Sequence, residues 1–315
     1  DGGNTPESLT STSTGPVANL NDPPVGSVTI DGVATEDQTL SANTSTLTDE
    51  DGLGSFMYEW LRDETPIAGA TGNTYLLTQA DVGASISVTV SYTDGGNTPE
   101  SLTSTSTGPV ANVNDPPVGS VTIVGLSEQG AILTANTSAL TDEDGLGPFS
   151  YQWIRGEANI PGANGSTYVL TQPDVDALIA VTVSYNDGGN TPESLTSTST
   201  GPVANVNDPP VGSVTIVGLS EQGAILTANT SALTDEDGLG PFSYQWIRGE
   251  ANIPGANGST YVLTQPDVDA LIAVTVSYND GGNTPESLTS TSTGPVANVN
   301  DPPVAVGDAI QVDEG

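Results

Sequence analysis

The chain has 315 residues, of which 39 are acidic and only three are basic, and its formal net charge is -36. Such a chain excludes nucleic acid as a partner, since nothing in it could neutralise phosphates, and an anionic membrane surface would repel it. It contains no His, no Cys and no Lys. Nucleophilic triads and most general bases are therefore missing, which predicts that the protein is not an enzyme.

The chain is a tandem array of one repeated unit. Residues 118–210 recur without a single change at 211–303, and a diverged copy fills 25–117. Residues 1–24 match the C-terminal part of a preceding repeat, and 304–315 open a following unit that no longer matches. A period of this length predicts one small domain per repeat, so we expect the chain to be a window of a longer protein. No apolar run is long enough to insert into a membrane.

Each repeat has the pattern of an all-β domain. In the middle repeat, six short segments combine strand-forming residues with alternation and are bounded by turn residues. These expected strands are 120–123, 132–135, 149–155, 167–170, 179–185 and 193–200. The last is polar on both faces, which is typical of an edge strand. Asn164-Gly165 predicts a tight hairpin turn before the fourth, because both positions tolerate a positive φ.

Short strands with frequent turn signals predict antiparallel β-sandwiches, and proline pairs in the linkers predict sandwiches arranged end to end as a rod. Alternation along the third strand places Phe149, Tyr151 and Trp153 on one face. We interpret that face as core; the alternative is a sugar-stacking surface. Arg155 ends the same strand, and a structural ion pair with Asp174 is expected there. The equivalent pairs are Arg62 with Asp81 and Arg248 with Asp267.

The repeats resemble immunoglobulin-like domains. The resemblance lies in the lone tryptophan of the third strand, at Trp60, Trp153 and Trp246, and in Asp81-Val-Gly83. This segment precedes the strand equivalent to 179–185, which corresponds to the sixth strand of an immunoglobulin domain. The chain departs from that family on the sixth strand. Apolar residues replace the cysteine, at Val88, Val181 and Val274, and the corner tyrosine, at Ile86, Ile179 and Ile272. The resemblance implies a sandwich held by apolar packing alone.

A closer resemblance is to the repeats of giant bacterial surface adhesins of the RTX type, carried by the pattern from Tyr151-Gln-Trp to Val183-Ser-Tyr185. The linker 112–118 also resembles cadherin junctions, and 304–315 is similar to the first strand of a cadherin-like domain. The family implies an extracellular extender on the bacterial cell surface, which projects a binding tip and is often rigidified by calcium. Its expected partners are neighbouring domains of the same chain, with homotypic or filament contacts also possible. The alternative function is a multivalent array of carbohydrate- or protein-binding modules.

Acidic residues recur in loops that immunoglobulin-like topology brings to one pole of each domain. These are the incoming linker, the loop between the second and third strands, and the loop between the sixth and seventh strands. The opposite pole of the preceding domain adds Glu36 and the turn at Asp81. The expected calcium ligands are Asp22, Asp49, Asp51, Asp94, Asn114, Asp115, Asp142, Asp144, Asp187, Asp208, Asp235, Asp237 and Asp280.

Calcium suits such a cluster because it takes six to eight oxygen ligands and turns carboxylate repulsion into cohesion, whereas magnesium demands a tighter octahedral geometry. The spacing does not match a complete EF-hand loop. The alternative is that these residues form ordinary solvated turns, since Asp-Gly and Asn-Gly are common turn sequences.

Overall fold

The computed structural model describes residues 6–300. By their internal contacts these residues fall into two compact units. Within 6–300, the first comprises the residues up to Ser120, with Ser138–Phe149 and Ser184–Leu195, and the second comprises Val121–Thr137, Ser150–Val183 and the described residues from Thr196 onward. The middle repeat therefore contributes residues to both. None of the helical turns in the described part has the length and apolar character that a membrane-spanning helix requires.

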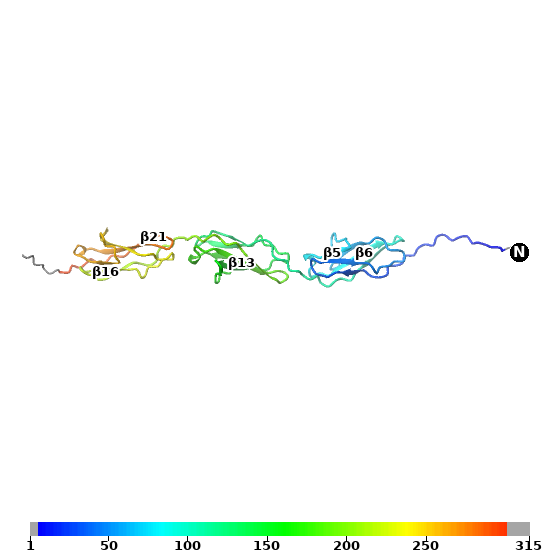
Figure 1. The fold of residues 1–315 in the computed structure, drawn as a ribbon, viewed down its shortest axis with the longest axis horizontal. Helices are drawn as coiled ribbons and strands as arrows, with labels where there is room; N and C mark the ends of the chain where they lie inside the picture. Colours follow the sequence, from blue (N-terminus) through cyan, green and yellow to red (C-terminus); the bar gives the residue numbers. More distant parts are fainter. Residues whose placement is uncertain (1–5, 301–315) are drawn as a thin grey trace, which may run out of the picture. The chain divides into compact units, whose positions relative to one another are not determined.

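Short strands and three 3-10 helices make up the regular structure of residues 6–300 (Figure 1). The first repeat holds β1 (Thr29–Asp31), β2 (Thr39–Asn43), β3 (Met57–Arg62), β4 (Thr65–Pro66), β5 (Thr74–Leu76), η1 (Gln79–Asp81), β6 (Ile86–Thr93) and β7 (Pro99–Thr103). The second holds β8 (Thr122–Val124), β9 (Ile132–Asn136), β10 (Ser150–Arg155), β11 (Ala158–Asn159), β12 (Thr167–Val169), η2 (Gln172–Asp174), β13 (Ile179–Asn186) and β14 (Pro192–Thr196). The third holds β15 (Thr215–Val217), β16 (Ile225–Asn229), β17 (Ser243–Arg248), β18 (Ala251–Asn252), β19 (Thr260–Val262), η3 (Gln265–Asp267), β20 (Ile272–Asn279) and β21 (Pro285–Thr289).

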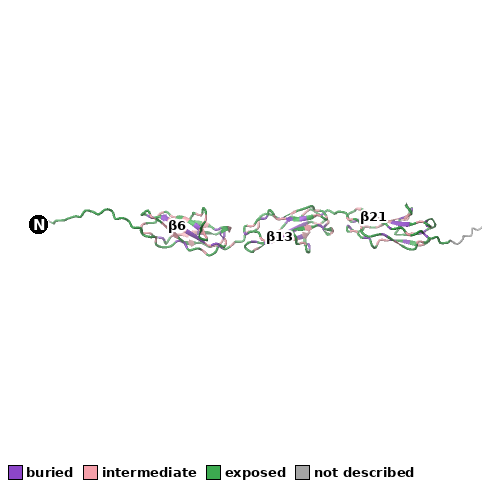
Figure 2. Cartoon of the chain, turned by 180° about the vertical axis from the view of Figure 1, so that it is seen from behind, coloured by how far each residue is buried: buried purple, intermediate pink, exposed green. Residues whose placement is uncertain are grey.

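Each repeat builds two sheets. The three-stranded sheets have the orders β1-β2-β5, β12-β9-β8 and β15-β16-β19, and the four-stranded sheets have the orders β4-β3-β6-β7, β11-β10-β13-β14 and β18-β17-β20-β21. In the third repeat both sheets contribute to one apolar core, with Leu226 from β16 and Trp246 and Val274 from β17 and β20. Among the strands, β6, β13 and β20 carry the most buried residues (Figure 2). The prediction of all-β, immunoglobulin-like sandwiches in tandem is confirmed.

The arrangement of these sandwiches as a rod stays a prediction. The same holds for the repeat boundaries at 25–117, 118–210 and 211–303. The expected cadherin-like start at 304–315 lies outside the described residues.

The tryptophan of each repeat packs inside the sandwich. Trp246 lies opposite Val274 in the β17–β20 register and is fully buried. Its ring stacks on Tyr261 with 5.7 Å between the ring centroids, and its Nε1–H donates to the Gly258 carbonyl over 2.9 Å. Aromatic rings in such positions supply much of the apolar area of a small core. The interpretation of the aromatic face as core is confirmed, and a buried ring offers no sugar-stacking surface.

The last strand of each four-stranded sheet lies at the edge, as its polar character predicts. Beyond the end of β21, hydroxyl side chains take over the role of backbone acceptors. Ser290 Oγ accepts the Val274 N–H over 3.0 Å, and Thr293 Oγ1 accepts the Ile272 N–H over 3.2 Å. The Ser/Thr-rich sequence therefore satisfies backbone donors of the central strand where the ladder stops.

The hairpin expected at Asn164-Gly165 is wrong. The strands on either side of it pair with different partners, β11 with β10 and β12 with β9. The segment between them passes from the four-stranded to the three-stranded sheet. The tight turn lies earlier, where Arg155 pairs with Ala158 and Gly156 has a φ of 60°. A glycine there supplies the positive φ that two-residue hairpin loops need.

Gly240 allows a close approach that positions the acidic loops. A Cβ at this residue would lie 2.0 Å from the carbonyl oxygen of Asn279, a backbone atom that cannot move aside. We expect Gly240→Ala to lower the free energy of unfolding by about 1–3 kcal/mol, as overpacking does. Gly294→Ala is the matched control, because a Cβ there would meet nothing within 4 Å, and its expected effect is within about 0.5 kcal/mol. Urea denaturation measures both, and equal effects would contradict the prediction.

Candidate metal centre

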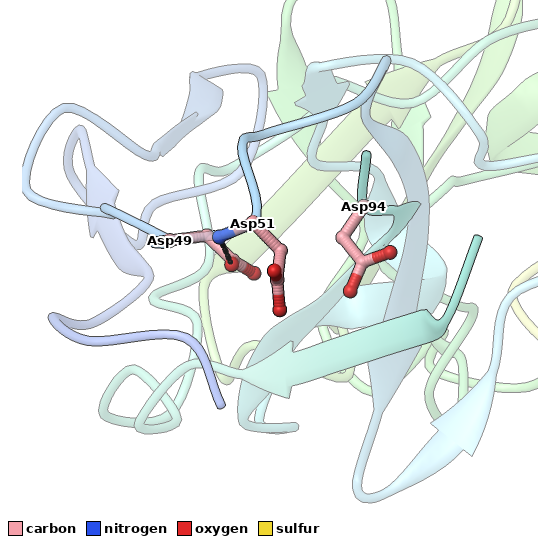
Figure 3. Close-up of side chains that lie close together, drawn as sticks. All are labelled: Asp49, Asp51 and Asp94. Atoms are coloured by element: carbon pink, nitrogen blue, oxygen red, sulfur yellow. Dashed lines mark hydrogen bonds between the residues drawn. The ribbon is translucent and has the colours of Figure 1, made fainter. Parts of the chain in front are cut away.

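Three carboxylates come together where two loops of the first repeat meet. Asp49 and Asp51 lie in the loop between β2 and β3, and Asp94 follows directly after β6. One carboxylate oxygen of each lies within 4.8 Å of the others (Figure 3). The two loops are joined by a hydrogen bond from the Gly95 N–H to the Asp51 carbonyl over 3.0 Å. The structure therefore assembles three of the predicted ligands from residues distant in the sequence.

The carboxylates also hold their own loops in shape. Asp49 Oδ1 accepts the Asp51 N–H over 2.9 Å, and Asp49 Oδ2 accepts the Tyr92 hydroxyl over 2.7 Å. Asp94 Oδ1 accepts the Thr98 N–H over 2.7 Å. Burial and the neighbouring Asp49 carboxylate hold the pKa of the Tyr92 hydroxyl well above its usual range, so this group remains a donor. Hydrogen bonds within ordinary turns thus occupy one oxygen of Asp49 and one oxygen of Asp94. They do not account for the second oxygen of either carboxylate.

One oxygen of Asp94 is left without a partner. Asp94 is 5% exposed, and its Oδ2 is buried with no hydrogen-bond donor within reach. A buried, ionised acceptor that lacks a donor is costly. The same observation recurs at Asp144 Oδ1, Asp187 Oδ2 and Asp280 Oδ2, each on a residue that is 7% exposed. Such oxygens fit a cation, which would supply the missing positive charge.

The linker before each repeat is fastened to the acidic loop. The backbone N–H of Asp22 donates to Asp51 Oδ2 over 2.8 Å. The N–H of Asp115 binds Asp144 Oδ2 in the same way, and that of Asp208 binds Asp237 Oδ2, over 2.8 and 2.7 Å. One residue earlier, the side-chain amides of Asn21, Asn114 and Asn207 donate to Glu100, Glu193 and Glu286. The predicted proximity of linker and loop is therefore present in all three repeats.

The second and third repeats reproduce the loop geometry. The Asp144 N–H donates to Asp142 Oδ1 over 3.0 Å, and the Tyr185 hydroxyl donates to Asp142 Oδ2. Asp235 and Asp237 are linked identically in the third repeat, with Tyr278 as the donor. The Gly188 and Gly281 N–H groups join the loops of Asp187 and Asp280 to those of Asp144 and Asp237. Among the described residues, however, only the first repeat brings three carboxylates, those of Asp49, Asp51 and Asp94, within 4.8 Å of one another.

Side chains from the preceding repeat also reach the junctions. Gln172 Nε2 donates to Asp237 Oδ1 over 3.2 Å, while its own Oε1 is buried without a partner. Both residues line a polar cavity of about 430 Å³ together with Asn205 and Gly282. Gln79 Oε1, the equivalent atom of the first repeat, is also buried without a partner. An unpaired amide oxygen is a further ligand type that calcium accepts.

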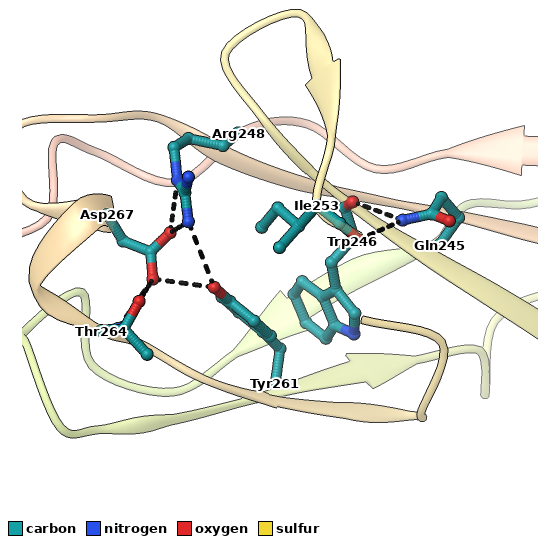
Figure 4. Close-up of polar contacts among 7 residues, drawn as sticks. All are labelled: Gln245, Trp246, Arg248, Ile253, Tyr261, Thr264 and Asp267. Atoms are coloured by element: carbon teal, nitrogen blue, oxygen red, sulfur yellow. Dashed lines mark hydrogen bonds and ion pairs between the residues drawn. The ribbon is translucent and has the colours of Figure 1, made fainter. Parts of the chain in front are cut away.

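The carboxylate of Asp81 does not join the cluster, because it forms the ion pair that the sequence predicts. Asp81 is fully buried and binds Arg62, with 2.7 Å between Oδ1 and a guanidinium nitrogen. The expected pairs Arg155–Asp174 and Arg248–Asp267 are present as well. In the third repeat Asp267 also accepts hydrogen bonds from Tyr261 and Thr264 (Figure 4). Burial alone would raise the pKa of Asp267, but these hydrogen bonds and the guanidinium hold it below its usual value.

The sequence interpretation found the acidic loops but missed their supports. Tyr92, Tyr185 and Tyr278 were recognised only as strand residues, although their hydroxyls orient the first carboxylate of each loop. Glu100 and its equivalents, which hold the linker, gave no signal beyond an ordinary polar edge strand. The tyrosine and the aspartate lie 43 residues apart along the chain, so no local motif links them.

A scan against models of known protein families finds no match, and a search of curated proteins finds none either. Among solved structures, the chain is similar to a Ca²⁺-stabilised adhesin with which an Antarctic bacterium reaches out and binds ice, at 12% identity, covering 89% of this chain and 75% of that chain, with a TM-score of 0.29. It is also similar to a tetra-tandem repeat in the extending region of a large adhesion protein, at 15% identity, coverages of 87% and 74% and a TM-score of 0.27. A segment of titin matches at 14% identity, coverages of 88% and 99% and a TM-score of 0.24. Similarity at this level assigns neither a family nor an activity.

Proposed function

We propose that the chain is a non-catalytic extender of a bacterial cell-surface adhesin, in which calcium bound at the repeat junctions stiffens the array. The observation that carries the proposal is the set of buried carboxylate oxygens without donors, at Asp94, Asp144, Asp187 and Asp280. The oxygens of Asp94, Asp187 and Asp280 recur at the same place in successive repeats, next to a linker that is hydrogen-bonded to the adjoining loop. A cation bound there would hold the linker and the acidic loops together.

A structural role accounts for features that catalysis or recognition would leave unexplained. Two repeats are identical at every position, which multiplies length without diversifying any surface. The tryptophans are fully buried, which weakens the alternative of an array of carbohydrate-binding modules. Export to the cell surface, a distant binding tip and a part in adhesion or biofilm formation complete the proposal. The remaining expected partners are neighbouring domains of the same chain.

Calcium should stabilise the chain strongly. At free calcium about 100 times the dissociation constant, binding to the folded state alone adds about 2.7 kcal/mol to the free energy of unfolding. For a domain of under about 100 residues, that corresponds to a rise in Tm of roughly 10–20 °C. We therefore expect titration calorimetry to detect saturable calcium binding, and a chelator to lower the Tm by this amount. Small-angle scattering should show a stiffer and more extended particle with calcium than with chelator.

A pair of substitutions assigns the effect to one junction. Asp144→Asn with Asp187→Asn removes the charge of both carboxylates that carry a partnerless oxygen in the second repeat. The remaining amide oxygen of each is needed by the backbone N–H that it accepts, so we expect the pair to abolish one calcium site. Glu143→Gln is the matched control, because it removes a charge from an exposed side chain in the same loop. If calorimetry finds no calcium binding, and scattering with and without chelator superimposes, these clusters are only turns. Selective, saturable binding on a glycan array would instead favour the module alternative.

A further inference from the structure

One of the positions at which the first repeat differs from the others contacts the outgoing linker. The first repeat has Glu36 where the second has Gln129 and the third has Gln222. All three side chains are held in the same way by the outgoing linker. The Val113 N–H donates to Glu36 Oε2 over 3.2 Å, the Val206 N–H to Gln129 Oε1 over 3.2 Å, and the Val299 N–H to Gln222 Oε1 over 3.3 Å.

After the second repeat, the remaining end of this side chain is a donor. Gln129 Nε2 donates to Asp208 Oδ2 over 2.6 Å. Asp208 in turn donates its own N–H to Asp237. An amide donor at this place satisfies one carboxylate oxygen of the linker without any bound ion. At this junction the protein itself therefore supplies a donor to one carboxylate oxygen of the linker.

After the first repeat, the same place holds a carboxylate, which has no proton to donate. Glu36 is only 2% exposed. Burial raises the pKa of its carboxyl, and the nearby carboxylates of Asp115 and Asp144 raise it further. Asp144 also carries the buried Oδ1 that lacks a hydrogen-bond donor. Three acidic side chains thus act on one another, while the three arginines of residues 6–300 pair with other aspartates.

We propose that Glu36 is an additional ligand for a divalent cation, so that the junction after the first repeat binds calcium more tightly than the junction after the second, where Gln129 replaces it. This inference rests on the proposed calcium-dependent function and deepens it. Calcium affinity in proteins rises with the number of charged ligands, and a carboxylate binds it better than an amide that already donates to a neighbour. The array then has two classes of junction, which stiffen at different calcium concentrations.

Reciprocal substitutions in the chain 1–315 test the inference by calcium titration calorimetry. Glu36→Gln places in the first repeat the residue that the second repeat uses, so it should fold. We expect it to weaken the tightest site by about tenfold or more, an effect on the scale of about 1.4 kcal/mol. Gln129→Glu should create a second tight site. Glu59→Gln is the matched control, because Glu59 is exposed on β3 and the second repeat has Gln152 in its place.

The outcomes separate this inference from the function on which it rests. Loss of the tight site in Glu36→Gln, with its retention in Glu59→Gln, supports the inference. If the unmodified chain binds calcium but Glu36→Gln and Glu59→Gln give the same isotherm, the inference is wrong and the calcium-dependent function stands. If the unmodified chain binds no calcium, both are wrong. A change in the pH dependence of Tm in Glu36→Gln without any change in calcium affinity would show that a proton, not a cation, occupies this place, and would also overturn the inference.

Discussion

Replacing Trp246 with alanine is expected to destabilise the third repeat by about 3–5 kcal/mol, the range typical of large-to-small changes at a buried aromatic residue. The ring is 0% exposed and packs between the two sheets, so the surrounding side chains cannot close the cavity without moving both. The substitution also removes the stacking on Tyr261 and the donor to the Gly258 carbonyl. A loss of this size is a large fraction of the total stability of a small domain, which is about 5–15 kcal/mol.

Urea denaturation followed by far-ultraviolet circular dichroism measures this loss. Trp153→Ala is an internal comparison, because the second and third repeats have identical sequences. We expect the two variants to lose the same free energy to within about 0.5 kcal/mol if the repeats unfold independently. A loss below about 1 kcal/mol in either variant would show that the tryptophan is not the centre of the core.

The fold was largely predictable because its signals are local. Alternation identifies β6, β13 and β20, and the four alternating large side chains of each are buried, although Ser87, Ala180 and Ala273 on the other face are buried too. The polar edge strand was predictable for the same reason. The Arg–Asp pairs were predictable because each repeat has a single cation. The misplaced hairpin shows the limit of such signals. Asn164-Gly165 suits a tight turn, but which strands pair across it depends on partners elsewhere in the chain.

The candidate site was predictable only in part. Immunoglobulin-like topology places the loops of Asp49 and Asp94 at one pole of the domain, and the two residues do lie close together. The orientation of each carboxylate was not predictable, since it depends on hydroxyl and amide donors from strands and linkers far away in sequence. Asp81 illustrates the difficulty. Its ion pair with Arg62 was predictable, but the hydrogen bond from the Tyr75 hydroxyl that also turns its side chain inward was not.

The buried ion pair gives the second large effect. Asp267 is 0% exposed and Arg248 is 32% exposed. Arg248→Met leaves the aspartate buried with hydroxyl and backbone donors but without its cation. Removing one partner of a fully buried pair costs about 3–5 kcal/mol, and the partial exposure of the arginine reduces our expectation to about 2–3 kcal/mol. Asp267→Asn should cost less, because the guanidinium left behind can turn toward water.

The pH dependence provides the sharper test of the same pair. The pKa of Asp267 is lowered in the folded chain, below the ordinary value of 3.8. The stability that it contributes is therefore present above pH 3.8, the value for the unfolded chain, and is lost as the pH falls through the lower folded value. Without Arg248 the folded pKa rises, so less stability remains to be lost in acid. The free-energy difference between the unmodified chain and Arg248→Met should shrink as the pH falls from about 7 to about 2.5.

Urea denaturation of the two proteins at a series of pH values measures this difference directly. The other carboxylates titrate in both proteins, so their contributions largely cancel in the comparison. In the double variant Arg248→Met with Asp267→Asn, the pair is gone altogether, and its difference from Asp267→Asn should not change with pH. A gap between Arg248→Met and the unmodified chain that stays constant down to about pH 2.5 would mean that the arginine acts through the packing of its aliphatic stem rather than through its charge.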